Sequence, residues 1–252
     1  MKQHSSIDFL LHLADNALIL SQRNAEWCGH GPVLEQDIAI TNISLDLLGQ
    51  ARNFYQYAAQ LLNEQANTNE PITEDSLAYL RKEREFKNCL LTELPRGDWA
   101  QTILRQFLFS NYQNQLMNLL KESDDSQIAA IAEKSLKEIT YHLRWSAEWV
   151  IRLGDGTEES RARMEKAISE QWPYTGEMFI AADYEKQNGI DPALLQSAWM
   201  EKVKEVFEEA TLAIPANTFM HTGGKQGVHT EHLGYILTEL QYMQRAYPGA
   251  AW

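Results

Sequence analysis

Helical periodicity is the feature that most constrains the fold of this 252-residue chain. In residues 33–62 and 127–152, apolar or small side chains recur every three or four positions, which places them on one face of a helix. The same spacing recurs in residues 7–22 and 99–121. No stretch alternates apolar and polar side chains as a half-buried strand does. The sequence therefore predicts an all-α fold with four long helices.

Glycine and proline residues mark where these helices begin and end. Gly29, Gly31 and Pro32 separate the first two long helices, and Pro32 suits the first turn of the second. A shorter helix is expected to open at Thr73 and to run through about Leu91. Further helices are expected over 157–186 with a kink at Pro173, over 192–213 and over 229–246.

The connection between the second and third long helices is long, because residues 67–98 intervene. One long crossover is the connectivity of ferritin-like four-helix bundles, whereas an up-down bundle has short loops. We therefore expect one ferritin-like domain over residues 1–252, with additional short helices.

Composition excludes several classes of partner. A net charge of −13 argues against nucleic acid, which requires a basic face, and against anionic membrane surfaces. It still permits a local basic patch for a phosphorylated small molecule. Cys28 and Cys89 are too few and too far apart for a metal knuckle or a disulfide framework, so we interpret both as reduced core thiols. The apolar runs are too short for a signal sequence or a membrane span, which predicts a soluble cytoplasmic protein.

The motif Glu-x-x-His is absent from the chain. Di-iron ferritin-like bundles take this pair from two of their helices, so that both side chains reach the same two irons. The residues three places before the seven histidines are Met1, Phe9, Trp27, Ile139, Thr218, Gln226 and His229. A bundle that lacks this motif suggests a partner protein rather than a catalyst on its own, and we expect no metal or cofactor in this chain.

Six residues stand where the ligands of such a centre are expected: Asp15, Asp46, Gly49, Asn111, Glu138 and Tyr141. A carboxylate-bridged centre needs about four carboxylates and two imidazoles. Here three carboxylates remain, Gly49 offers no ligand atom, and Tyr141 replaces an imidazole. We interpret the set as a vestigial, metal-free pseudo-site.

Two alternatives remain open at the pseudo-site. Asp46 and Glu138 are also compatible with ordinary solvated positions on helices. The other alternative is a di-iron oxygenase with an aberrant ligand set, made of Asp15, Asp46, Glu138 and His142. Buried carboxylates without metal need compensation, because each isolated charge costs several kcal/mol. The basic residues expected to supply it are Arg52, Arg105, Lys137 and Arg144.

His229 and His232 form a second candidate site, since an i, i+3 pair shares a helix face and binds zinc in some hydrolases. A zinc site needs a third protein ligand, and a hydrolase also needs an open position and a general base. His221 is the one conceivable third ligand. The alternative is that these are polar residues at the start of a helix near an interface.

A basic run supplies the third candidate site. Arg81, Lys82, Arg84 and Lys87 place four cations in seven residues of an acidic chain. They suit contact with phosphates, and they equally suit a solvated helix face with Glu–Lys pairs. The run Gly-Gly-Lys-Gln-Gly at 223–227 is a loop that lacks the Walker pattern and follows no strand, although it suits an anion.

Four segments carry a resemblance to a known family: NAEWCGHGP at 24–32, NISLDLLGQARN at 42–53, YHLR at 141–144 and TGGKQGVHTEHLG at 222–234. They resemble the C subunits of bacterial phenylacetyl-CoA 1,2-epoxidases, which are multicomponent, ring-epoxidising monooxygenases. The resemblance extends from about residue 8 to Trp252, and motifs of this length are specific.

The resemblance implies a ferritin-like, non-catalytic subunit without iron. Its partners are expected to be a homologous A subunit that carries the di-iron centre, a reductase subunit that delivers electrons from NADPH, and a small bridging subunit. The pathway is aerobic phenylacetate degradation in the cytoplasm. The subunit is also expected to help bind phenylacetyl-CoA, whose phosphates are anionic.

The family pattern assigns two segments to that ester. The first matches Glu85, Phe86, Lys87 and Asn88, within the pattern Arg-x-Phe-x-Asn-x-Leu-Leu that begins at Arg84. The second follows the match to residues 172–179, where this chain is shorter than the family pattern. It is placed at Ala181, Ala182 and Asp183.

Overall fold

The computed structural model describes residues 2–65, 71–216 and 218–250, and of residues 2–6 the backbone alone. Every regular element in these ranges is a helix, so the all-α prediction is confirmed. Contacts group the chain into two compact units, which are described separately. Unit 1 comprises Met1–Pro95, Ala182–Ile190 and Gly223–Trp252, and unit 2 comprises Arg96–Ala181 and Asp191–Thr222. A single domain over 1–252 stays a prediction.

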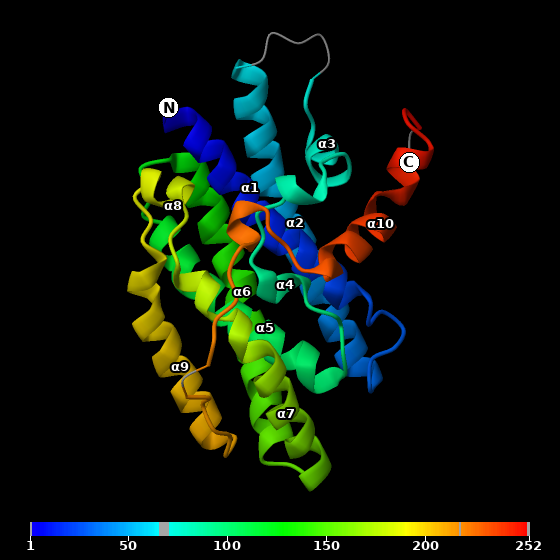
Figure 1. Cartoon of the computed structure of the whole chain (residues 1–252), viewed down its shortest axis with the longest axis vertical. Coiled ribbons are helices and arrows are strands. Elements are labelled where there is room, and N and C mark those ends of the chain that lie inside the picture. Colours follow the sequence, from blue (N-terminus) through cyan, green and yellow to red (C-terminus); the bar gives the residue numbers. More distant parts are fainter. Residues whose placement is uncertain (1, 66–70, 217, 251–252) are drawn as a thin grey trace. The chain divides into compact units, whose positions relative to one another are not determined.

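Unit 1 is built on two long antiparallel helices, α1 (Lys2–Ala25) and α2 (Leu34–Gln65), which lie side by side in Figure 1. Their direction follows from two contacts. The Ser21 hydroxyl donates to the Ser44 carbonyl at 2.8 Å, and further along the pair the Tyr55 hydroxyl reaches Asp15. Most of α1 is buried, including a continuous run over residues 9–21.

The expected helix from Thr73 through Leu91 is wrong over most of its length. The helix α3 (Glu74–Tyr79) ends after six residues, and a 3-10 turn (Glu83–Glu85), extended backbone and the short helix α4 (Leu90–Glu93) follow. The cause is a set of inward hydrogen bonds from this segment to α1, described below. Unit 1 is completed by α8 (Asp183–Gln187), a 3-10 turn (Gly224–Gln226) and α10 (Glu231–Ala246).

Unit 2 is built on a second antiparallel pair, α5 (Trp99–Leu120) and α6 (Ser126–Gly154). Trp99, at the start of α5, packs edge-on against Trp145 and Trp149 near the end of α6, with ring centroids 6.0 Å apart in both pairs. Both helices begin at an aspartate, Asp98 and Asp125, whose carboxylate accepts from backbone N–H groups of the first turn.

The remaining helices of unit 2 are shorter than expected. The helix α7 (Glu158–Gln171) ends before Pro173, which has no N–H to donate, and two 3-10 turns (Trp172–Tyr174 and Gly176–Phe179) replace the expected kinked helix. The helix α9 (Gln196–Glu209) follows a 3-10 turn (Pro192–Leu195).

The two cysteines are free, and Cys89 is buried as expected. Cys28 is exposed, so its assignment to the core is wrong, because it lies in the turns that follow α1. None of the described helices is both long enough and apolar enough to cross a membrane.

Candidate functional site

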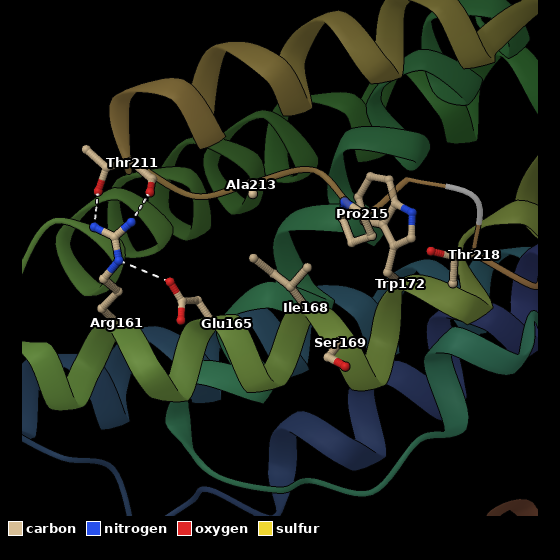
Figure 2. Close-up of a pocket in the computed structure, with 9 residues that line it drawn as sticks. All are labelled: Arg161, Glu165, Ile168, Ser169, Trp172, Thr211, Ala213, Pro215 and Thr218. Atoms are coloured by element: carbon tan, nitrogen blue, oxygen red, sulfur yellow. Dashed lines mark hydrogen bonds and ion pairs between the residues drawn. The ribbon is translucent and has the colours of Figure 1, made fainter.

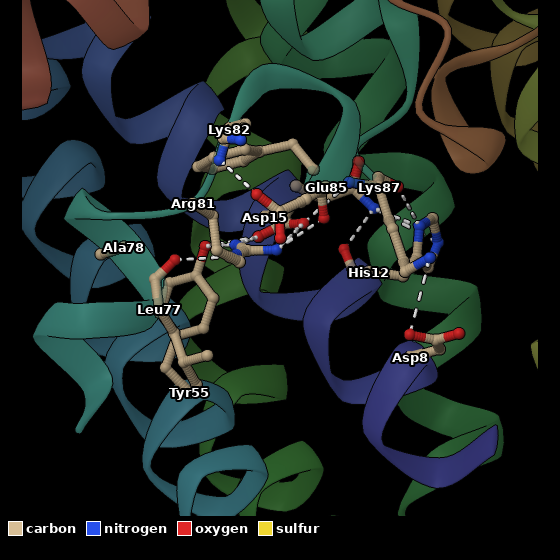
Figure 3. A network of polar contacts seen from close by, with 12 residues as sticks. Asp8, His12, Asp15, Tyr55, Leu77, Ala78, Arg81, Lys82, Glu85 and Lys87 are labelled. Carbon is tan, nitrogen blue, oxygen red and sulfur yellow. Dashed lines mark hydrogen bonds and ion pairs between the residues drawn. The ribbon is translucent and has the colours of Figure 1, made fainter. Parts of the chain in front are cut away.

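Residues 81–93, here called the strap, cross α1 in unit 1 and surround Asp15. This carboxylate is fully buried. Its Oδ1 accepts from the Tyr55 hydroxyl and from Arg81 Nη2. Its Oδ2 accepts from Arg81 Nη1 at 3.1 Å and from the Lys87 backbone N–H at 2.8 Å, as Figure 3 shows.

These contacts satisfy both charged partners. A carboxylate offers about four lone-pair sites, and Asp15 receives four donors. Burial raises the pKa of Tyr55 well above its usual range, and the Asp15 charge raises it further, so the hydroxyl stays a donor. Burial, the largest single effect, lowers the pKa of Arg81, but the charge and hydrogen bond of Asp15 together with Tyr55 and Glu85 outweigh it and raise that pKa. Asp15 therefore has no lone pair left for a metal ion, and the residues around it do not fit an iron centre.

Side chains of α1 also satisfy the backbone of the strap. His12 Nδ1 contacts the Lys87 carbonyl at 2.7 Å, and Asn16 Oδ1 accepts from the Cys89 N–H at 2.8 Å. Buried backbone groups outside helices need such partners. Asp15, His12 and Asn16 thus hold the middle of the strap, residues 86–89, in an extended conformation.

A second ion pair is buried beside the strap. Lys225 Nζ lies 3.0 Å from both carboxylate oxygens of Glu185, and both side chains are almost fully buried. His12 Nε2 lies 3.8 Å from the same carboxylate. Burial, the largest effect, and the Lys225 charge lower the pKa of His12 to about 4, although Glu185 opposes them. The loop at 223–227 therefore directs its cation inward at Glu185.

His229 lies at the other end of the strap. Its Nδ1 is 2.8 Å from Glu93 Oε2 and its Nε2 is 2.9 Å from the Phe86 carbonyl. Both neighbours are acceptors, so the arrangement suits an imidazole that carries two protons. Burial lowers the pKa of His229, but the hydrogen bond and charge of Glu93 outweigh it and raise that pKa. Both ring nitrogens are therefore engaged, which argues against a zinc ligand.

Comparison with known proteins decides the family. A family model described as phenylacetic acid catabolic protein matches residues 1–252. The chain belongs to this family. The phenylacetic acid catabolic proteins are ferritin-like helical proteins, which confirms the predicted fold class. The chain is also 48% identical to the C subunit of the 1,2-phenylacetyl-CoA epoxidase of Escherichia coli (strain K12), over 97% of this chain and 98% of that protein.

In this member of the family, the six pseudo-site positions fall in both units. Asp15, Asp46 and Gly49 lie in unit 1, and Asn111, Glu138 and Tyr141 lie in unit 2. Asp15 lies opposite Tyr55, whereas Asp46 is two residues from Ser44, which lies opposite Ser21. Ser21 lies six positions beyond Asp15, which is about 9 Å of helix, so Asp15 and Asp46 do not share one level of the α1–α2 pair.

The other pseudo-site residues differ widely in exposure. Asp46 and Glu138 are half-buried, Gly49 and Tyr141 are exposed, and Asn111 is buried and donates to the Trp199 carbonyl at 2.9 Å. Among the described residues, no three His, Cys, Asp or Glu side chains are grouped closely enough to hold a metal ion. The pseudo-site stays a prediction.

The cation beside Asp15 differs from those expected. Arg81 forms the ion pair with Asp15, whereas Arg52 pairs with Glu74 at the surface at 3.3 Å. The interpretation of Arg81 as a phosphate contact is wrong for the same reason, because its guanidinium points inward. The cation found at this position thus comes from the strap.

The predicted ester-binding residues of the strap alternate in direction. Glu85 is exposed and Lys87 is half-buried, whereas Phe86 and Asn88 are fully buried. Phe86 lies under the Arg81 guanidinium at 4.2 Å, and Asn88 donates to Glu93 at 2.8 Å. Extended backbone turns successive side chains to opposite sides. Only Glu85 and Lys87 therefore present side chains outward.

The structure brings the two predicted ester-binding segments together within unit 1. Lys87 Nζ lies 5.5 Å from the ring centroid of Tyr184, which follows Ala182 and Asp183 in the chain, and 3.5 Å from Asp8. Asp183 is exposed and pairs with Lys186 at 3.7 Å, and Ala182 is buried. Ala181 belongs to unit 2. The ester-binding role stays a prediction.

Unit 2 contains a separate groove of about 430 Å³ between α7 and residues 211–218 (Figure 2). Arg161 closes one end by donating to the Thr211 hydroxyl at 2.7 Å and to the Thr211 carbonyl at 2.5 Å, and Trp172 lies at the other end. None of the predicted site residues lines this groove.

Tyr55, Glu93 and Glu185 are the site residues that sequence reasoning missed. They belong to no motif that marks a buried partner, and each contact joins positions at least 40 residues apart. The available signal was Asp15 itself, a charged residue within the largely apolar run of residues 9–20.

Proposed function

We propose that this chain is the C subunit of a phenylacetyl-CoA epoxidase. In this role it binds no iron itself, pairs with a di-iron catalytic subunit, and helps to hold the coenzyme A ester. The observation that carries the proposal is the 48% identity to the C subunit of the E. coli epoxidase, which extends over nearly the whole of both chains. A reductase subunit and a small bridging subunit complete the proposed complex, which acts in the cytoplasm.

The geometry around Asp15 supports the iron-free part of the proposal. Arg81 supplies positive charge beside this carboxylate, and Tyr55 and the Lys87 N–H fill its remaining acceptor sites. The charge balance that a di-iron centre takes from its metal ions is here supplied by the strap. In the proposed complex, oxygen chemistry belongs to the partner.

The surface beside Lys87 supports the ester-binding part. The Lys87 ammonium lies 5.5 Å from the ring centroid of Tyr184, and the Lys186 ammonium pairs with the neighbouring, exposed Asp183 at 3.7 Å. Cations at a surface attract phosphates even where the whole chain is acidic. We assign the phosphates of the ester to this surface, with Lys87 as the principal contact.

Metal content and turnover test the proposal together. The chain is purified anaerobically alone and after co-expression with the di-iron subunit. Iron per chain and NADPH- and O₂-dependent epoxidation of phenylacetyl-CoA are then measured. We expect neither stoichiometric iron nor turnover from the chain alone, and stable co-purification with an active, iron-bearing partner.

Two irons per chain in the isolated protein would overturn the proposal and favour the aberrant ligand set. The half-buried Asp46 provides a matched variant, Asp46→Asn. This change lowers iron content if Asp46 is a ligand, and leaves it unchanged under the proposal.

A further inference from the structure

A largely exposed stripe runs along α2 on the side away from its buried residues. Its members, here called the α2 stripe, are Leu34, Ile38, the half-buried Thr41, Leu45, Leu48 and Arg52. The four aliphatic side chains are 72%, 52%, 60% and 39% exposed. We infer that the α2 stripe is the docking face for a long helix of the di-iron subunit, an inference that rests on the proposed function.

The spacing of the stripe identifies a helix as its occupant. Its members follow one another at intervals of four and three residues, the a/d spacing by which two helices pack nearly parallel, at about 20°. From Leu34 to Arg52 the stripe is about 27 Å long. Such a narrow, straight apolar surface matches one side of a second helix of about five turns.

Gly49 lies beside the stripe, on the exposed side of α2. A Cβ at this position would meet nothing within 4 Å. Glycine inside a helix costs about 1 kcal/mol relative to alanine, so open space makes it a poor choice for the chain alone. A partner backbone approaching α2 closely explains it, because glycine leaves room for that approach.

A pocket of about 230 Å³ lies where the stripe meets α3. Leu48, Ala78 and Tyr79 form part of its apolar lining, and Arg52 and Glu74 lie among its polar lining residues. Apolar pockets with polar rims are where interface anchors insert. The docking helix is therefore expected to place one large apolar side chain here.

The negative charge around the stripe favours a partner subunit over a second copy of this chain as the occupant. The surface around the stripe and its pocket carries Glu35, Asp46, Glu74 and Asp75, against one arginine, Arg52, which already pairs with Glu74. The whole chain has a net charge of −13. Two such faces repel each other, so the complementary occupant is a helix with basic residues beside its apolar seam.

Two variants and a matched control test this face in the complex. Leu45→Glu places a charge on the stripe, and Gly49→Leu fills the open space. Leu194→Glu makes the same substitution at a leucine that is 76% exposed in unit 2. The Kd for the di-iron subunit is measured for each, together with the thermal midpoint of each chain alone.

We expect both α2 variants to raise this Kd at least about tenfold and the control to leave it unchanged within about twofold. Gly49→Leu should also raise the thermal midpoint of the chain alone by about 2 °C, because leucine is the better helix former. Weaker pairing by a more stable chain excludes unfolding as the cause.

Two results would overturn the docking face. One is an unchanged Kd for both α2 variants while the wild type pairs normally. The other is self-association of the chain alone that Leu45→Glu abolishes, which would assign the stripe to a second copy. Failure of the wild-type chain to bind the di-iron subunit at all would instead refute the proposed function, and with it this inference.

Discussion

Arg81 and Asp15 form a buried ion pair in which every polar atom of both side chains has a partner. Arg81 uses its five N–H groups on Asp15, Tyr55, the Leu77 carbonyl and the Glu85 carbonyl. Buried charges are tolerated when they are paired and fully hydrogen-bonded. The pair therefore fixes the strap to α1 and α2.

Breaking this pair should strongly destabilise the chain. Arg81→Met leaves the Asp15 carboxylate buried without a counter-charge, and we expect a loss of about 3–5 kcal/mol in the free energy of unfolding by urea. The double variant Asp15→Asn with Arg81→Met should cost clearly less than the sum of the two single changes. Arg52→Met, which breaks the exposed pair with Glu74, serves as the control at about 1 kcal/mol or less.

His12 should make the chain less stable in acid. Its folded pKa of about 4 lies below the unfolded value of 6.5, so its contribution is present above pH 6.5 and is lost as pH falls towards 4. We expect wild type to lose about 2 kcal/mol at pH 5 through this residue. The measurement is urea unfolding at pH 7.5 and 5.0. An equal loss in His12→Gln would contradict the assignment.

The contribution of His229 should have the opposite pH dependence. Its folded pKa is raised, so the stability it supplies is fully present below the unfolded value of 6.5 and is lost as pH rises through the folded pKa. The stability difference between wild type and His229→Gln should therefore shrink from pH 6 to pH 9. Removing the partner charge in Glu93→Gln should suppress most of this trend.

Gly227 should resist substitution more strongly than a glycine of the same conformation elsewhere. Gly227 and Gly249 share a φ of +78°, but a Cβ at Gly227 would lie 2.2 Å from the Arg84 carbonyl oxygen, whereas Gly249 has open space. Gly249→Ala should cost about 1–2 kcal/mol for its backbone conformation. Gly227→Ala should cost several kcal/mol more, measured by urea unfolding, because the strap must move. If Gly227→Ala and Gly249→Ala cost the same free energy of unfolding, the strap moves without a measurable cost and the prediction is wrong.

Lys87→Glu should weaken the binding of phenylacetyl-CoA by the assembled complex. The change reverses one charge at the proposed phosphate contact and leaves the Lys87 N–H bound to Asp15. We expect the Kd from calorimetry at low salt to rise about tenfold, and the effect to shrink as salt is added. Lys166→Glu makes the same change of charge on the exposed face of α7 and should have little effect. An unchanged Kd for Lys87→Glu at low salt would refute the contact.

Sequence reasoning succeeded where one local rule decided the structure. The long helices follow from apolar spacing, which involves only residues close together in the chain. The prediction for the strap was wrong because distant residues, not local ones, determine its structure. Arg81 and Lys87 resemble a solvated helix face, and the acceptors that hold them lie on α1, more than 60 residues away.

For the candidate site, the sequence pattern indicated segments, but it did not indicate the directions of their side chains. Lys87 of the first segment does lie beside Tyr184, the residue that follows the second segment. Phe86 and Asn88 point inward because the backbone there is extended, a consequence of contacts that Asp15 and His12 make from α1. No short-range pattern in the sequence carries that information.

Unit 1 is made of segments that are far apart in the sequence, and this affects how it folds during translation. Glu185 and Lys225, which bury their charges against each other, belong to segments translated after much or all of unit 2. On the ribosome, α1 and α2 therefore emerge long before the groups that cover His12 and the strap. Contacts this distant in sequence form slowly. Until they form, the apolar surfaces of α1 and α2 are exposed and prone to aggregation. Co-translational capture of the α1–α2 hairpin by a chaperone would protect the nascent chain during this interval.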